Sequence, residues 1–172
     1  MSFEKALQKV LQLEGGLVLH KNLTEETETY AGIYRKAHPN WEGWKYIDSG
    51  QTPPFELVKQ FYYENFYKPL ELIENNTIRN LLFEFAVNAS LKTAIKLLQK
   101  VVGAKSDGII GKETLQKLNN YLVNNFEENF IKDYTLARIA FYTNLANKNP
   151  SKYNLYLRGW INRSLKALEE IA

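Results

Sequence analysis

The sequence predicts a mainly α fold, and three observations carry that prediction. Apolar residues recur with the period of an amphipathic helix along most of the chain. Short stretches containing glycine, proline or asparagine separate these periodic segments, which is typical of packed helices joined by short loops. The chain has 172 residues, 45% of them hydrophobic, and that is enough to bury a substantial core.

The first helix is predicted at the N-terminus, where an apolar stripe consists of Phe3, Ala6, Leu7, Val10 and Leu11. Gly15 and Gly16 end this helix, because glycine adopts left-handed backbone angles without a Cβ clash. Glu14 therefore falls on the last turn. A carboxyl held between an apolar core and an open site is what glycosidic-bond hydrolysis requires of its general acid. A solvent-facing glutamate at a helix end explains the same fragment.

Residues 17–54 are predicted to be irregular, with a short β-hairpin near residues 17–30. A segment of this length inside a compact domain is usually functional. Tyr30, Trp41 and Trp44 fall within it, and aromatic rings stack on the apolar faces of sugars. They are candidate substrate-binding residues, although aromatic side chains also attach a long loop to the core.

The remaining elements are predicted to be helices. One opens after Pro54 and is interrupted by Pro69, and the next begins near Thr77 after a turn at Asn75. Another carries Leu97 and Leu98 and ends at Gly103. Three further helices follow the turn that begins at Asp107, the last two near 128–146 and 154–170.

In the second half, Leu97 and Gln99 lie on a predicted helix, which is followed by D-G-x-x-G-x-x-T from Asp107 to Thr114. This arrangement resembles the pattern of peptidoglycan-binding domains. Asp107 and Gly108 predict a tight turn, and the Thr114 hydroxyl is predicted to satisfy free amides in the first turn of the next helix. The same residues also explain a purely structural helix–turn–helix.

Several motifs occur in a fixed order: Glu14-Gly15-Gly16, Thr29-Tyr30-Ala31-Gly32-Ile33, Val87-Asn88, the D-G-x-x-G-x-x-T stretch, and Gly159-Trp160-Ile161-Asn162-Arg163. In this order the chain resembles the phage-type N-acetylmuramidases of glycoside hydrolase family 108. Those are lysozyme-like endolysins with a C-terminal peptidoglycan-binding-like region. The resemblance covers roughly residues 3–170 and implies a lysozyme-like helical fold. It also implies hydrolysis of the β-1,4 bond between N-acetylmuramic acid and N-acetylglucosamine.

The resemblance implies that Glu14 is the general acid, with a pKa raised by partial burial. It carries the family's threonine over to Thr29. The family's aspartates and second glycine pair are absent from residues 17–29, and one residue is inserted there. Glu25, Glu26 and Glu28 are therefore the candidates for a second carboxylate, and Asn88 is a further candidate for substrate binding.

This departure leaves three hypotheses open. The first is an endolysin-type muramidase that uses Glu14 and one of the three further glutamates. The second is a non-catalytic peptidoglycan-binding protein that has lost the second carboxylate. The third is a lytic transglycosylase, which uses a single glutamate and forms anhydro products.

Composition limits the partners. The chain has no cysteine and only two histidines without metal-ligand spacing, so we expect no metal and no organic cofactor. A net charge of +3 spread along the chain does not favour nucleic-acid binding. We expect glycan strands of peptidoglycan as the partner, no stable membrane association, and a monomer.

The chain is expected to be made in the cytoplasm, since its start lacks a basic segment followed by an apolar run. It is expected to act on the wall in the periplasm or outside the cell. We expect a lysozyme-like catalytic portion at 1–76 and a peptidoglycan-binding-like portion at 77–172, packed as one compact unit.

Overall fold

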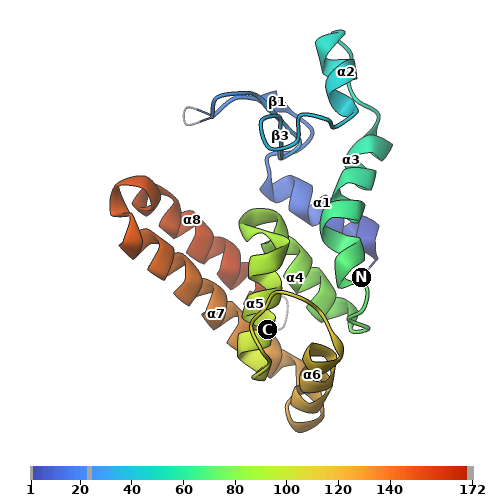
Figure 1. Ribbon diagram of the computed structural model, residues 1–172. Coiled ribbons are helices and arrows are strands. Elements are labelled where there is room, and N and C mark those ends of the chain that lie inside the picture. The colour runs from blue at the N-terminus through green and yellow to red at the C-terminus, as the bar shows by residue number, and fades with distance from the viewer. Residues whose placement is uncertain (1, 23–24, 170–172) are drawn as a thin grey trace. The chain divides into compact units, whose positions relative to one another are not determined.

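The computed structural model describes residues 2–22 and 25–169, and it divides into two compact units. Unit 1 comprises Met1–Val87 and unit 2 comprises Asn88–Ala172. Helices dominate both, and a small antiparallel sheet lies in unit 1 (Figure 1). The predicted mainly α, lysozyme-like fold class with a β-hairpin after the first helix is confirmed.

Unit 1 begins with α1 (Phe3–Leu13), whose buried face is the predicted stripe of Ala6, Leu7, Val10 and Leu11. The sheet follows as β1 (Leu19–His20), β2 (Thr29–Tyr30) and β3 (Ile33–Tyr34), in the order β1-β2-β3. Tyr30 pairs with Leu19 on one side and with Ile33 on the other. The sheet therefore places β2 at its centre.

The rest of unit 1 is helical. It contains α2 (Gly43–Asp48), α3 (Phe55–Tyr62), a π-helical segment (Tyr63–Tyr67) and a 3₁₀ turn (Lys68–Leu70). The predicted interruption at Pro69 takes the form of these two irregular turns. The helix α4 (Asn76–Ala89) begins where the Asn75 side chain accepts a hydrogen bond from the Ile78 amide at 3.0 Å. Asn75, predicted to form a turn before this helix, therefore caps its N-terminus.

Aromatic rings form much of the core of unit 1. Phe83 on α4 lies edge-on to Tyr62 and Tyr67, and Phe3 of α1 contacts the same ring of Tyr67 at 4.7 Å between centroids. Edge-to-face and tilted contacts of this kind stabilise a core beyond the area they bury. They attach the N-terminal end of α1, and α4, to the end of α3 and to the π-helical segment that follows it.

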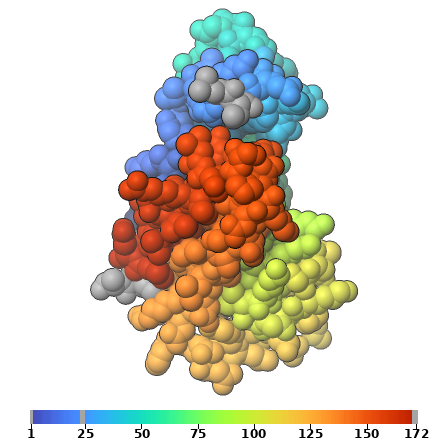
Figure 2. Space-filling model, turned by 90° about the vertical axis from the view of Figure 1, so that its left-hand side faces the viewer, coloured from blue at the N-terminus to red at the C-terminus, as the bar shows by residue number. Residues whose placement is uncertain are grey.

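Unit 2 consists of α5 (Leu91–Val102), α6 (Lys112–Asn124), α7 (Glu127–Lys148) and α8 (Pro150–Glu169). The last two lie side by side as a long antiparallel pair, orange and red in Figures 1 and 2. Tyr134 of α7 donates a hydrogen bond to the Ala94 carbonyl of α5 at 3.0 Å. That bond satisfies a buried hydroxyl and joins α7 to α5.

The loop between α5 and α6 is organised by one buried amide. The Gln99 side chain is 0% exposed, and its Nε2 donates to Asp107 Oδ1, to the Ile109 carbonyl and to Thr114 Oγ1 at 2.8–3.0 Å. Its Oε1 accepts the Gly108 amide at 2.8 Å. The predicted turn is confirmed, because Asp107 accepts the Ile109 amide and Gly108 has a φ of +83°.

One detail of that turn differs from the expectation. The Thr114 hydroxyl donates to the Ile109 carbonyl at 3.3 Å and accepts from Gln99, so it satisfies no free amide of the helix. The predicted portions, 1–76 and 77–172, divide at the start of α4, whereas the compact units divide at Val87 and Asn88. Among residues 2–22 and 25–169, no helix is both long and apolar enough to cross a membrane.

Candidate functional site

Glu14 directly follows α1 and is its C-cap residue. Its amide donates to the Val10 carbonyl at 3.0 Å, and the Gly16 amide turns back to the Leu11 carbonyl at 2.8 Å. Gly15 and Gly16 have φ values of +87° and +83°, which glycine adopts without strain. The Glu14 side chain is half-buried. A rigid helix end thus carries a carboxyl that still reaches solvent.

The turn between β2 and β3 lies directly against Glu14. A Cβ placed on Gly32 would come within 3.1 Å of Glu14 Cγ and 3.2 Å of Glu14 Cβ. It would also lie 2.5 Å from the hydroxyl of Tyr62, which donates to the Ala31 carbonyl at 2.7 Å. Ala31 and Gly32 both have positive φ, as a two-residue hairpin turn of the primed type requires. Glycine at position 32 therefore lets the hairpin turn lie against the aliphatic part of the Glu14 side chain.

Thr29 and Glu25 form a pair beside this turn. Thr29 is buried on β2, and its hydroxyl donates to Glu25 Oε2 at 3.1 Å. The same oxygen accepts the Asn22 amide at 3.1 Å. Two donors thus fix one oxygen of this carboxylate. Of the three glutamates predicted as the second carboxylate, Glu25 is the one that contacts the predicted threonine.

The other two glutamates are in ion pairs. Glu26 lies 2.6 Å from the Lys36 ammonium, which holds the pKa of Glu26 below its usual value. Glu28 lies 3.2 Å from a guanidinium nitrogen of Arg35, and Arg35 also pairs with Asp48 at 2.6 Å. The Arg35–Asp48 pair attaches the hairpin to α2. Glu26 and Glu28 each have a basic partner that the sequence did not indicate.

Two of the three predicted substrate-binding aromatics stack on one another. The rings of Tyr30 and Trp41 are stacked with 6.0 Å between centroids, and burial raises the pKa of the Tyr30 hydroxyl. The Trp41 indole donates to the Leu57 carbonyl at 3.3 Å and remains half-buried. A Cβ on Gly43 would overlap its six-membered ring, so glycine there makes room for the ring. Trp41 can thus present part of its ring to a ligand.

Trp44 belongs to the core. It is 4% exposed, its indole donates to the His38 carbonyl at 2.7 Å, and the Arg35 guanidinium lies 4.5 Å from the ring centroid. Packing therefore covers the ring, and burial also lowers the pKa of His38. A role for Trp44 in binding substrate stays a prediction, and its burial favours the structural role.

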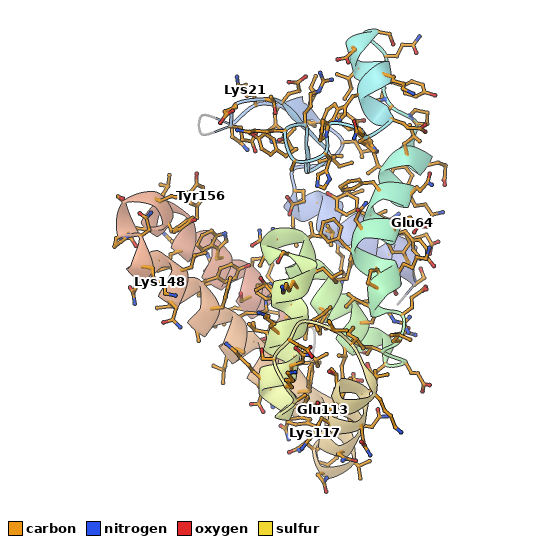
Figure 3. All side chains as sticks on the ribbon, viewed as in Figure 1. Lys21, Glu64, Glu113, Lys117, Lys148 and Tyr156 are labelled. Atoms are coloured by element: carbon orange, nitrogen blue, oxygen red, sulfur yellow. The ribbon has the colours of Figure 1, made fainter. Side chains whose placement is uncertain are left out.

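Asn88 is the one predicted site residue that lies in unit 2. Its side-chain oxygen accepts a hydrogen bond from the Tyr142 hydroxyl of α7. The Tyr142 ring stacks on Trp160 of α8 at 4.8 Å, and Trp160 stacks in turn on Tyr156 at 5.8 Å. Figure 3 labels Tyr156, the exposed end of this stack, on the α7–α8 pair. Asn88 is thus hydrogen-bonded to the first ring in a stack of three aromatic side chains, Tyr142, Trp160 and Tyr156.

Sequence reasoning missed several residues that shape the site. The sequence shows Gly32 only as part of a motif, whereas in the structure its contact with Glu14 joins the helix end to the hairpin. The Tyr62 hydroxyl also holds the turn, through its hydrogen bond to the Ala31 carbonyl. Asn22 supports Glu25 through its backbone amide, for which the sequence carries no signal because any residue type supplies that donor.

Comparison with known families agrees with this arrangement. Residues 7–89 match the family model described as Glycosyl hydrolase 108, and this range contains Glu14 and the hairpin. The N-terminal part of the chain is therefore similar to this family. Residues 93–165 match a second model, described as Predicted Peptidoglycan domain.

The fold has a counterpart among solved structures. The chain is similar to the "Structure of Brucella abortus SagA", with a TM-score of 0.71 and 22% sequence identity over 98% of this chain and 92% of that chain. Among curated proteins, none matches. The predicted recognition of a family 108 protein with a C-terminal peptidoglycan-type region is thus confirmed. The chain carries a glycoside hydrolase domain that acts on peptidoglycan.

Proposed function

We propose that this protein is an N-acetylmuramidase that hydrolyses the β-1,4 bond between N-acetylmuramic acid and N-acetylglucosamine. The observation that carries the proposal is the contact of Glu14 with Gly32, inside the matched range 7–89. A half-buried carboxyl at a rigid helix end, against a hairpin, suits a general acid that protonates the leaving glycosidic oxygen.

Glu25 is the proposed second carboxylate, and Thr29 assists it. The Thr29 hydroxyl donates its one hydrogen bond to Glu25, so its lone pairs can accept a hydrogen bond from water. Glu25 then acts on that water as a general base, or on the anomeric carbon as a nucleophile. The two routes require different carboxylate separations and give opposite anomers of the product. Nuclear magnetic resonance of the first product formed distinguishes them.

We assign hydrolysis to the N-terminal portion of the chain and attachment to peptidoglycan to the C-terminal portion. The two consecutive family matches, 7–89 and 93–165, support this division of labour. Action on peptidoglycan takes place at the cell wall. Trp41 and Tyr30 are proposed to bind a sugar ring near the hairpin, because Trp41 keeps part of its ring accessible.

Substitution of single carboxylates tests the proposal. Release of reducing ends from purified peptidoglycan is compared between the wild-type protein and the variants Glu14→Gln, Glu25→Gln and Glu26→Gln. Removing a general acid typically costs about 10²–10⁴-fold in rate, so Glu14→Gln is expected to lose that much. Glu26→Gln is the matched control, since Glu26 is exposed and paired with Lys36. It should retain most of the activity.

The products separate the remaining hypotheses. Mass spectrometry of the muropeptides is expected to show hydrolysed ends, which are heavier by one water than the anhydro ends formed by a lytic transglycosylase. Equal release of reducing ends by the wild-type protein and Glu14→Gln would remove Glu14 from its assigned role. Binding to walls without any cleavage by the wild-type protein would show that the altered loop no longer supports catalysis.

A further inference from the structure

The formal charge of the chain is divided unequally between its two units. Unit 1 carries nine Lys and Arg against twelve Asp and Glu residues, a formal charge of −3. Unit 2 carries thirteen against seven, a formal charge of +6. The small net charge of +3 is therefore the sum of a distinctly basic unit 2 and an acidic unit 1. A basic unit attracts anionic polymers at a distance.

Three of these cations form a row on α5. Lys92, Lys96 and Lys100 are spaced four residues apart, so they follow one side of the helix with about 6 Å of rise between neighbours. Lys92 and Lys100 are exposed, and Lys96 is half-buried. Among the described residues, no carboxylate lies within 4.0 Å of any of these three ammonium groups.

The α5–α6 loop packs on the aliphatic parts of the Lys92 and Lys96 side chains and holds them in place. A Cβ on Gly108 would lie 2.7 Å from Lys92 Cγ and 3.5 Å from Lys96 Cγ, so the backbone of the loop packs on both aliphatic stems. Long side chains that bury their stems keep the charged ends in water. Ordering the stems in advance lowers the conformational entropy that a ligand has to remove.

The nearby acids of the loop are already engaged. Asp107 accepts hydrogen bonds from Gln99 and from the Ile109 amide, which hold the pKa of that carboxyl below its usual value. Glu113 accepts the Lys105 amide at 3.2 Å, and Figure 3 shows it on α6 with Lys117. Residues 88–118 contain six lysines and only two acidic residues, so the surface around the row stays cationic.

We propose that Lys92, Lys96 and Lys100 form a tether that binds the carboxylates of the peptide stems of peptidoglycan. The inference rests on the proposed function for its polymer and extends it to a second binding site, in unit 2. The occupant follows from charge and from the family match. Residues 93–165 match the Predicted Peptidoglycan domain, and the stems carry the free carboxylates of that polymer. An ammonium row at regular spacing complements such carboxylates.

The test compares two triple variants of equal net charge in the full chain. One replaces Lys92, Lys96 and Lys100 with Gln. The control replaces three other exposed lysines with Gln, namely Lys132 and Lys148 on α7 and Lys166 on α8. Co-sedimentation measures affinity for peptidoglycan stripped of phosphate polymers, in a Glu14→Gln background so that the wall stays intact. Activity on peptide-free glycan oligomers is measured in the wild-type background.

The α5 triple is expected to bind about tenfold more weakly at low salt, because exposed ion pairs contribute little individually but act together here. The control triple should stay within about twofold of the parent, and the difference should vanish at 1 M salt. Lysine-to-arginine replacement of the row should preserve binding, which separates charge from folding. Amidating the wall carboxylates with a carbodiimide and ammonia should weaken the parent as much as the triple replacement does.

Equal losses in both triples would reduce the effect to net charge and overturn the proposal. So would binding that survives amidation, or binding that appears only on walls that keep their phosphate polymers. Hydrolysis of peptide-free oligomers should be unchanged in the α5 triple. If neither the wild-type protein nor any variant hydrolyses these oligomers, the proposed function is refuted. The proposed tether is still tested in that case, because co-sedimentation measures it independently of hydrolysis.

Discussion

Gly32→Ala is expected to damage both stability and hydrolysis, because the new methyl group has no room. The residue has a φ of +79°, and its Cβ would lie 2.5 Å from the Tyr62 hydroxyl. An alanine in left-handed conformation costs roughly 1–2 kcal/mol. Displacing Tyr62 also breaks its bond to the Ala31 carbonyl, which contributes about 1 kcal/mol. The expected loss of unfolding free energy is thus about 2–3 kcal/mol.

Calorimetry measures this loss against a matched control. Gly50 has a φ of +72° and nothing within 4 Å of its would-be Cβ, so Gly50→Ala carries the backbone cost alone. At roughly 2–4 °C per kcal/mol for a chain of this size, Gly32→Ala should lower Tm by about 4–12 °C, and Gly50→Ala by about half to two thirds of that. Hydrolysis should also fall below the melting range, since the methyl group presses on Glu14 Cγ at 3.1 Å.

A double variant examines the cause. Combining Gly32→Ala with Tyr62→Phe removes the hydroxyl that the methyl group meets, so the two losses should be less than additive. The reasoning is refuted if Gly32→Ala costs no more than Gly50→Ala, or if the two substitutions at the turn are strictly additive.

Three further outcomes are expected. Replacing Gln99 with Leu leaves the Gly108 amide and Thr114 without their buried partner. The free energy of unfolding, measured by urea denaturation, should fall by about 2–4 kcal/mol. The control Lys100→Gln changes an exposed residue and should cost under about 0.5 kcal/mol. Replacing Thr29 with Val should reduce hydrolysis more than replacing it with Ser, which keeps the bond to Glu25; equal kinetics for both would exclude the hydroxyl from catalysis. Burial lowers the pKa of His38, so the unfolded chain binds its proton first as pH falls. Stability should therefore be fully present above about pH 6.5 and decline below it, with a smaller decline in His38→Gln, and parallel curves for the two proteins would contradict this.

Local signals made much of the fold predictable. The apolar stripe of α1, its glycine stop and the Asp107-Gly108 turn depend on residues close together in sequence, and each is found as predicted. The short helix α2 was missed because no periodic stripe marks it. It is fixed instead by long-range contacts, in which Trp44 bonds to the His38 carbonyl and Arg35 reaches Asp48.

The three candidate glutamates could not be ranked from sequence for the same reason. Glu25, Glu26 and Glu28 are nearly adjacent, yet their partners come from different places. Lys36 and Arg35 follow the turn at Gly32, and a reader of the sequence cannot know which strand register brings them opposite the acids. Once the register is given, Glu25 remains as the acid beside Thr29.

The Gln99 side chain has a consequence for how this protein can change. It secures the α5–α6 loop from the inside, through contacts with backbone atoms of Gly108 and Ile109. The Ile109 side chain, 68% exposed, takes no part in that arrangement. The loop can therefore accept new outward-facing residues while its backbone path is retained. That makes it a suitable graft position for redirecting the protein to walls of different chemistry, with the interior amide left untouched.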